Sequence, residues 1–309
     1  MSFEYNSKHF NLVIEDKFIL KYLEENSTRP FFLGRFGGND FLSVRTYKQY
    51  GRNANYTRHI SECKNFCGYF DKDNSIENFY KYLETLYDCY KISDCFTNPC
   101  LTIPYTHEME SSFALDFLKD ICENKPVIKY DYIEAIYPFL NDFKVFAEGK
   151  RVLIVSPFSE TIKFQYKRKD QLVRNYEYPN FELITYNTPI TYNSDNDRLD
   201  CVQTRNWNEQ AELMANDISI LDFDIALLSC SSYAMYLGRH IYKNMHKQAI
   251  YIGGVMNVFF NIKGERYDGS EFYKRIMVHE TSIESFEKSL YKDVKGGRAI
   301  KSEAFRAYF

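Results

Sequence analysis

The sequence predicts an α/β fold: a doubly wound, mostly parallel sheet with a helix-rich N-terminal lobe. Four short apolar runs each end in small or hydroxyl residues and then enter a helix-like pattern; they are FFLGRFGGND, VLIVSPFSET, IALLSCSSYA and AIYIGGVMNV. Strand and helix patterns also alternate along the second half of the chain, as they do in a doubly wound sheet. The 309 residues are 45% hydrophobic and 26% charged, which gives enough apolar chain for one large core or two modest ones.

The first half of the chain, residues 1–148, is expected to be mainly helical. Apolar residues recur with a period near 3.6 in three segments, at 16–26, 76–90 and 110–123. Candidate N-caps precede the later two, at Ser75 and at Ser111 or Ser112. The break at 27–30 ends the first helix before a strand at 31–35. This lobe therefore contributes one strand-loop-helix unit and several helices.

The second lobe, residues 149–268, carries the strand-helix alternation. Expected strands are the runs at 151–155, 181–189, 224–228 and the apolar run that ends at 251–254. Expected helices are 160–172 and 207–221, with a polar loop at 190–206. The remainder, 269–309, reads as a C-terminal tail. Because no fixed-period repeat or low-complexity linker appears, we expect one compact, two-lobed unit.

Composition excludes several classes of protein. A formal net charge of -3 argues against nucleic acid as a partner. The eight cysteines form no CxxC pair and the six histidines are scattered, so the usual zinc spacing is absent. No secretory signal opens the sequence, and the apolar segment 249–262 is too short to span a bilayer. We expect a cytoplasmic protein with reduced thiols, with most Tyr and Phe residues in its core.

The first of the four loops offers groups suited to a phosphate-bearing ligand. Loops at the carboxyl ends of parallel strands line the ligand crevice, and the following helices direct backbone N–H groups at anions. Arg35 provides a guanidinium fork for phosphate oxygens, while Gly37 and Gly38 allow close backbone approach. Asn39 and Asp40 could hold a divalent metal that bridges a diphosphate. The alternative is a tight turn in which Asp40 merely caps a helix.

The other three loops supply further candidate donor-binding residues. They are Ser156 and Ser159; Ser229, Ser231, Ser232 and Tyr233; and Gly253, Gly254, Asn257, Lys263 and Arg266. The sequence contains no GxGxxG and no GxxxxGK[ST], which argues against a dinucleotide dehydrogenase and a P-loop ATPase. No GxSxG surrounds a serine, so a serine hydrolase is not favoured. A capped amphipathic helix remains the alternative for the second loop.

Two parts of the chain resemble known glycosyltransferases. From about Gly149 to Asp268, the segments GKRVLIVSPFSETIKFQYKRK, FDIALLSCSSYAMYLGRHI and KQAIYIGGVMNVFFNIKGERYD resemble a glycosyltransferase family of surface polysaccharide synthesis. Earlier, PFFLGRFGGNDF resembles the Arg-Phe-Gly-Asp-Gly-Glu segment of GT-D type glycosyltransferases, whose Asp-x-Glu pair is implied to bind a metal and a nucleotide sugar. The resemblance implies a Rossmann-like, GT-D-like fold.

When the Asp-x-Glu pair of that segment is aligned with this sequence, its two acids correspond to Gly38 and Asp40. The first carboxylate is therefore missing and the second is one methylene shorter, which puts dependence on Mn²⁺ or Mg²⁺ at Asp40 in question. The segment IEAIY resembles a Glu-Pro-Tyr segment of the same family and makes Glu134 a candidate base, although Ala135 replaces the proline.

The resemblance implies transfer of a sugar from a nucleoside diphosphate sugar to a hydroxyl of a glycan or sugar acceptor, with Asp40 and Glu134 as catalytic residues. One alternative is a non-catalytic nucleotide- or glycan-binding relative that lost the acidic pair. Another is a different transferase, such as a methyltransferase, on a similar sheet. The sugar, the acceptor, the stereochemical course and the oligomeric state stay open.

Overall fold

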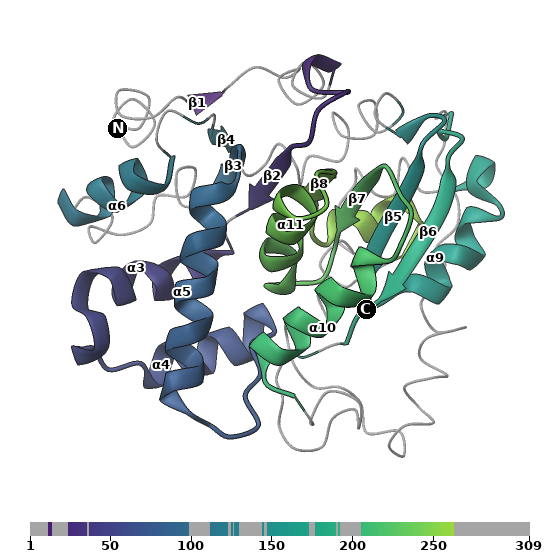
Figure 1. Cartoon of the computed structure of the whole chain (residues 1–309). Coiled ribbons are helices and arrows are strands. Elements are labelled where there is room, and N and C mark those ends of the chain that lie inside the picture. Colours follow the sequence, from purple (N-terminus) through teal and green to yellow (C-terminus); the bar gives the residue numbers. More distant parts are fainter. Residues whose placement is uncertain are drawn as a thin grey trace, which may run out of the picture.

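A computed structural model describes residues 12–13, 24–35, 37–98, 112–122, 125, 127–129, 144, 147–172, 177–189, 191 and 205–262. Within them, eight strands form one sheet in the order β1-β4-β3-β2-β8-β7-β5-β6. The strands are β1 (Leu12–Val13), β2 (Phe32–Arg35), β3 (Cys95–Asn98), β4 (Val127–Lys129), β5 (Arg151–Ser156), β6 (Glu182–Asn187), β7 (Ile225–Leu228) and β8 (Gln248–Tyr251). Every pairing is parallel, which confirms the predicted α/β class (Figure 1).

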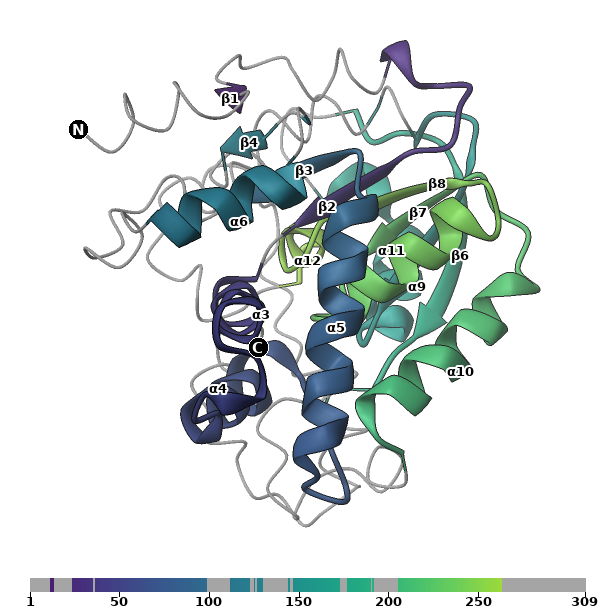
Figure 2. The same ribbon diagram turned by 60° about the vertical axis from the view of Figure 1, so that its left-hand side comes forward.

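Helices cover both faces of this sheet. They are α3 (Gly38–Tyr50), α4 (Thr57–Glu62), α5 (Ile76–Ile92), α6 (Ser112–Cys122), α9 (Ser159–Tyr166), α10 (Trp207–Ser219), α11 (Tyr233–Lys243) and α12 (Val255–Phe259). A π-helical turn, Cys63–Cys67, follows α4 directly. Helices α5, α10 and α11 lie on one face, and α9 and α12 lie on the other (Figure 2). Tyr178, in the connection between α9 and β6, donates a hydrogen bond of 2.8 Å to the carbonyl of Phe259 in α12, which ties the helices of the second face together.

Most predicted elements are found close to their expected places. Strands β2, β6 and β7 and helices α6 and α10 fall within the segments assigned from the sequence, β5 extends one residue beyond its segment, and α5 extends two residues beyond its own. The helix predicted at 160–172 was too long: α9 ends at Tyr166, and only a 3₁₀ turn, Lys169–Gln171, continues toward Leu172. Most of the helix expected at 16–26, almost all of the loop at 190–206 and the tail lie outside the described residues.

Both predicted lobes contribute strands to the same sheet. The register of β2 against β8 places Leu33 opposite Ile250. Nearby, the amide of Gln248 donates to the backbone carbonyls of Asn26, Ser27 and Arg29 at 3.0, 3.0 and 3.1 Å. The first strand-loop-helix unit is therefore built into the sheet of the second lobe, and β3, β4 and β1 extend that sheet beyond β2.

Aromatic side chains fill the core between the sheet and α5, α10 and α11. Trp207, the single tryptophan, is fully buried and stacks on Tyr233, with ring centres 5.3 Å apart and planes 6° apart. Tyr82 meets the same indole edge-on at 4.7 Å. Large rings such as these contribute to stability mainly through the apolar area that they remove from water. The prediction that these Tyr and Phe residues serve the core is confirmed for the described part.

Helix α11 approaches the sheet at a glycine. A Cβ at Gly238 would overlap the ring of Phe32 in β2, so only glycine permits the observed spacing between helix and strand. None of the helices in the described ranges is both long enough and apolar enough to cross a bilayer.

Candidate functional site

The four loops singled out in the sequence lie at one edge of the sheet. Their strands are consecutive, in the order β2-β8-β7-β5, and all run parallel. The backbone N–H groups of Ile252 and Gly253 both donate to the carbonyl of Leu228 at 3.1 Å, and Ser229 donates to Val155 at 2.8 Å. These bonds join the loops after β8, β7 and β5 side by side. The expected convergence of the loops is therefore a property of the fold.

At this edge, the helices that follow the neighbouring strands β2 and β8 lie on opposite faces of the sheet. After β2 it enters α3 on the face of α5, whereas after β8 it enters α12 on the face of α9 (Figure 2). Such divergence opens the crevice in which open α/β sheets bind their ligands. Arg35, at the end of β2, and Gly253, directly after β8, meet at this point.

The guanidinium of Arg35 is held against the loop after β8. Arg35 is 9% exposed, and its Cζ lies 5.8 Å from the centre of the Tyr251 ring. A Cβ at Gly253 would overlap Arg35 Nη1, and Gly253 has a φ of +67°. The positive φ favours glycine here, and an added Cβ would also have to displace the guanidinium.

The N-terminus of α3 follows Arg35 closely in the sequence. Gly37 is the N-cap and makes no side-chain capping bond, and the first helical bond runs from Phe41 N to Gly37 O at 2.9 Å. In the part of the chain that the structure describes, no heavy atom outside the neighbouring backbone lies within 4 Å of the position that a Gly38 Cβ would take, whereas Asp40 Oδ2 lies 2.8 Å from the position of a Gly37 Cβ. Backbone N–H groups in the first turn of a 13-residue helix attract an anion, and the Asp40 carboxylate already lies near this end.

Asp40, predicted as a catalytic and metal-binding residue, is buried. It is 6% exposed, and its carboxylate accepts a hydrogen bond from the hydroxyl of Tyr82. Burial raises the pKa of Asp40 from 3.8 to about 6, against the hydrogen bonds from Tyr82 and Cys67, which lower it. One carboxylate oxygen of Asp40 and the sulfurs of Cys63 and Cys67 all lie within 4.8 Å of one another. The sequence search missed this cluster because it looked for CxxC, and these cysteines are four residues apart.

Mn²⁺ and Mg²⁺ do not fit the groups around Asp40. Those ions prefer several oxygen ligands, such as carboxylates, carbonyls and water. Here Gly38 supplies no carboxylate, Asp40 is engaged by Tyr82, and the neighbouring donors are thiols. No step of the function proposed below passes through either ion.

Several predicted hydroxyl groups serve internal hydrogen bonds. Ser231 donates to the carbonyl of Cys67, and Ser232 Oγ accepts from Trp207 Nε1 at 2.9 Å. Ser156 Oγ accepts from the backbone N–H of Phe158 at 3.1 Å. These contacts bind the loops to the core, so we do not assign Ser156, Ser231, Ser232 or the stacked Tyr233 to a ligand.

The remaining predicted residues lie partly within the described part of the chain and partly outside it. Ser159 is buried, Ser229 is half-buried at the edge, and Gly254 is buried after β8. Asn257, in α12, is 2% exposed, and its Oδ1 has no hydrogen-bond partner among the residues that the structure describes. Glu134, Lys263 and Arg266 lie outside the described residues.

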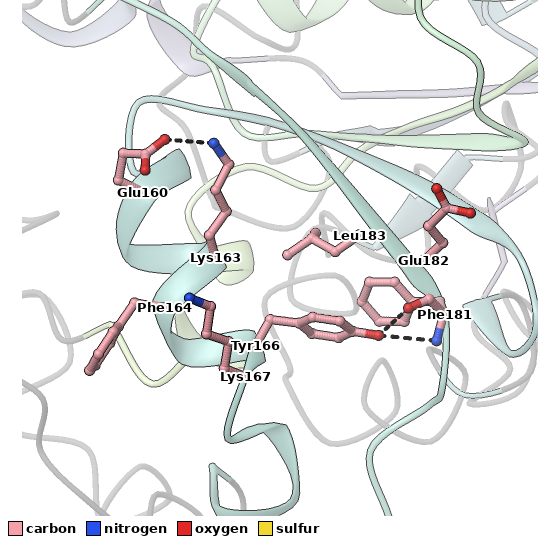
Figure 3. Close-up of a pocket in the computed structure, with 8 residues that line it drawn as sticks. All are labelled: Glu160, Lys163, Phe164, Tyr166, Lys167, Phe181, Glu182 and Leu183. Carbon is pink, nitrogen blue, oxygen red and sulfur yellow. Dashed lines mark hydrogen bonds and ion pairs between the residues drawn. The ribbon is translucent and has the colours of Figure 1, made fainter.

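A surface hollow lies elsewhere, between α9 and the start of β6 (Figure 3). Its volume is about 490 Å³, and it is lined by Glu160, Lys163, Phe164, Tyr166, Lys167, Phe181, Glu182 and Leu183. Lys163 pairs with Glu160 at 2.7 Å, and the Tyr166 hydroxyl bonds to the backbone of Phe181. Because Phe181–Leu183 lies at the amino end of β6, this hollow is not part of the edge described above.

Comparison with family models and with curated proteins gives no match. Two solved structures are similar in fold. One, described as the domain of unknown function 1792 with a distinct glycosyltransferase fold, is 12% identical, covers 88% of this chain and 91% of its own, and has a TM-score of 0.47. The other, a selenomethionine-substituted structure of domain of unknown function 1792, is 12% identical, covers 88% of this chain and 92% of its own, and has a TM-score of 0.42.

Proposed function

We propose that this chain is a glycosyltransferase that binds the diphosphate of a nucleoside diphosphate sugar between the ends of β2 and β8. The observation that supports this function best is the position of Arg35, whose buried guanidinium is fixed against Gly253 at the edge where ligands bind in parallel sheets.

The reaction would use these groups on the leaving diphosphate. When the bond between the anomeric carbon and the phosphate oxygen breaks, negative charge grows on that oxygen. Arg35 and the backbone N–H groups of Gly38 and Asn39 at the start of α3 would stabilise this charge, since both are in place before the reaction. Gly254 and Asn257, after β8, are proposed as further contacts to the donor.

Deprotonation of the acceptor hydroxyl needs a base within hydrogen-bond reach. Glu134 is our proposed base, on the resemblance described above. Asp40 is less suited to this role, because its carboxylate faces Tyr82 and the two thiols rather than open space.

Calorimetric titration tests the proposed donor site. Wild-type protein is titrated with UDP, GDP and TDP, and the tightest ligand is then titrated into Arg35→Ala and Arg35→Lys. Loss of a charged hydrogen-bonding partner should weaken binding by about 10- to 100-fold for alanine, with lysine intermediate. Arg52→Ala is the matched control, because Arg52 is exposed and pairs with Glu77 at 2.9 Å outside the site. If no diphosphate binds, or if both arginine positions behave alike, the proposal is wrong.

A second function, donor binding without turnover, is favoured by one observation. The position of the first acid in the GT-D segment is Gly38, and Asp40 is withdrawn into the protein. Release of UDP, GDP or TDP from the matching sugar nucleotides, in the presence of glycan acceptors, separates the two functions. Binding without release supports a binding module, and release that requires Arg35 supports the enzyme.

A further inference from the structure

A cluster of buried metal-ligating side chains lies behind the proposed donor site. Asp40 comes from the first turn of α3, and Cys63 and Cys67 come from the π-helical turn after α4. The three residues are 6%, 0% and 6% exposed. One carboxylate oxygen and the two sulfurs all lie within 4.8 Å of one another.

Cys63 and Cys67 lie on one π-helical turn, four residues apart, so their side chains share one face, as residues i and i+4 also do in an α-helix. Such turns are rare and are frequent at functional sites. Gly68, with a φ of +74°, ends the turn directly after Cys67. The backbone thus aims both thiols at the Asp40 carboxylate.

We propose that Asp40, Cys63 and Cys67 bind a thiophilic divalent cation, with Zn²⁺ as the natural occupant. In a tetrahedral zinc site, Zn–S distances of about 2.3 Å and Zn–O distances of about 2.1 Å place neighbouring ligand atoms about 3.5 to 3.8 Å apart. The observed spacing of at most 4.8 Å requires the ligands to close by at most about 1.3 Å. Two sulfurs and one carboxylate match the ligand preference of Zn²⁺ and not that of Mn²⁺ or Mg²⁺.

Neighbouring side chains would orient these ligands. Tyr82 donates to Oδ1 of the Asp40 carboxylate. Ser43 Oγ lies 3.4 Å from Cys63 Sγ and 3.0 Å from His59 Nδ1. Partners of this kind fix the orientation of metal ligands. Binding would release the two thiol protons to solvent, and a water would take the fourth position.

The cation would also secure the loop after β7. The carbonyl of Cys67 accepts hydrogen bonds from the hydroxyl of Ser231 and from Ser232 N, the latter at 3.2 Å. The carbonyl of Gly68 accepts one from Thr191. Zinc on the π-helical turn would therefore stabilise α3 and the β7–α11 loop together. This inference does not depend on the proposed transferase activity.

Zinc binding is tested on the untagged full chain in a non-thiol reductant. After equilibrium dialysis against Zn²⁺, elemental analysis should give one zinc per chain, and Co²⁺ in its place should give a thiolate-to-cobalt charge-transfer band. Cys63→Ser and Cys67→Ser should each lose the zinc and the band. Cys122→Ser is the matched control, because Cys122 is also buried but lies on α6, outside the cluster.

A milder variant covers the case in which a ligand variant does not fold. Ser43→Ala keeps all three ligands and removes the contact to Cys63 Sγ, so zinc affinity, measured by competition with a chelating dye, should fall about 10-fold or more. The proposal is overturned if wild-type protein takes up no zinc, if the cobalt complex lacks the thiolate band, or if the Cys63, Cys67 and Cys122 variants bind zinc equally.

Discussion

Replacing Asp40 with asparagine should remove a pH-dependent part of the free energy of unfolding. The folded-state pKa of Asp40 is about 6, against 3.8 for an unperturbed carboxyl group, because the residue is buried. Folding therefore favours its protonated form. The stability that Asp40 contributes is fully present below about pH 4 and is lost as the pH rises through about 6.

The size of the effect follows from that difference in pKa. A shift of about two units corresponds to about 3 kcal/mol between the protonated and the ionised form. Asparagine is nearly isosteric, stays neutral and can still accept the hydrogen bond from Tyr82. Relative to wild type, Asp40→Asn should thus become more stable by about 3 kcal/mol between pH 4 and pH 8.

Urea denaturation, followed by the fluorescence of Trp207, measures this difference at intervals from pH 4 to pH 8. A chelator is present, so that a bound cation does not contribute. Tyr82→Phe, which removes a hydrogen bond that lowers the pKa of Asp40, should move the transition to higher pH. Asp116→Asn, at an exposed position on α6, controls for the loss of one negative charge. If the stability difference between Asp40→Asn and wild type is the same at every pH, the inferred burial of an ionisable carboxyl is wrong.

Three further predictions concern packing. Gly253→Ala should cost about 1 to 3 kcal/mol in urea denaturation and should weaken diphosphate binding in calorimetry, because it combines a positive φ with a clash against the arginine guanidinium. Gly149→Ala, with a φ of +70° and open space around its Cβ, isolates the backbone cost; equal losses of binding at both positions would contradict the clash. Gly238→Ala should cost about 1 to 3 kcal/mol, and combination with Phe32→Leu should recover part of it in a double-mutant cycle; strict additivity would argue against the contact. Trp207→Ala should lower stability by about 3 to 5 kcal/mol in thermal or urea unfolding monitored by circular dichroism, and a loss below about 1 kcal/mol would show that the stacked core is not as described.

The elements predicted best are those whose own residues show a clear strand or helix pattern. The run Arg151–Ser156 is apolar and β-branched, and it forms a central strand. Helix α10 begins at Trp207, as expected, and Asn206 and Glu209 form a capping box that can be read from the sequence. By contrast, β3 and β4 fall in no segment assigned as a strand from the sequence, and their pairing with neighbours in the sheet defines them.

The sequence predicted that the four loops converge, but not the contacts among their residues. That the loops share an edge follows from parallel strands, but the order that brings Gly253 against Arg35 depends on which strands pair. The partner of Asp40 is Tyr82, 42 residues away, and nothing local in the sequence links them. Likewise, the spacing of Cys63 and Cys67 places both on one face of a helix, but nothing local in the sequence brings Asp40 to them. Long-range pairing is therefore the information that local patterns lack.

The pairing of β2 with β8 sets the order of events during synthesis. Strand β2 leaves the ribosome long before β8, and the amide of Gln248 bonds to a carbonyl 222 residues earlier in the chain. At about 5 to 20 residues per second, the apolar β2 segment would wait roughly 10 to 45 s for its inner neighbour. During that time the edge of β2 that later pairs with β8 stays exposed in the nascent chain, which makes it a substrate for chaperones and a source of aggregation when it is overexpressed.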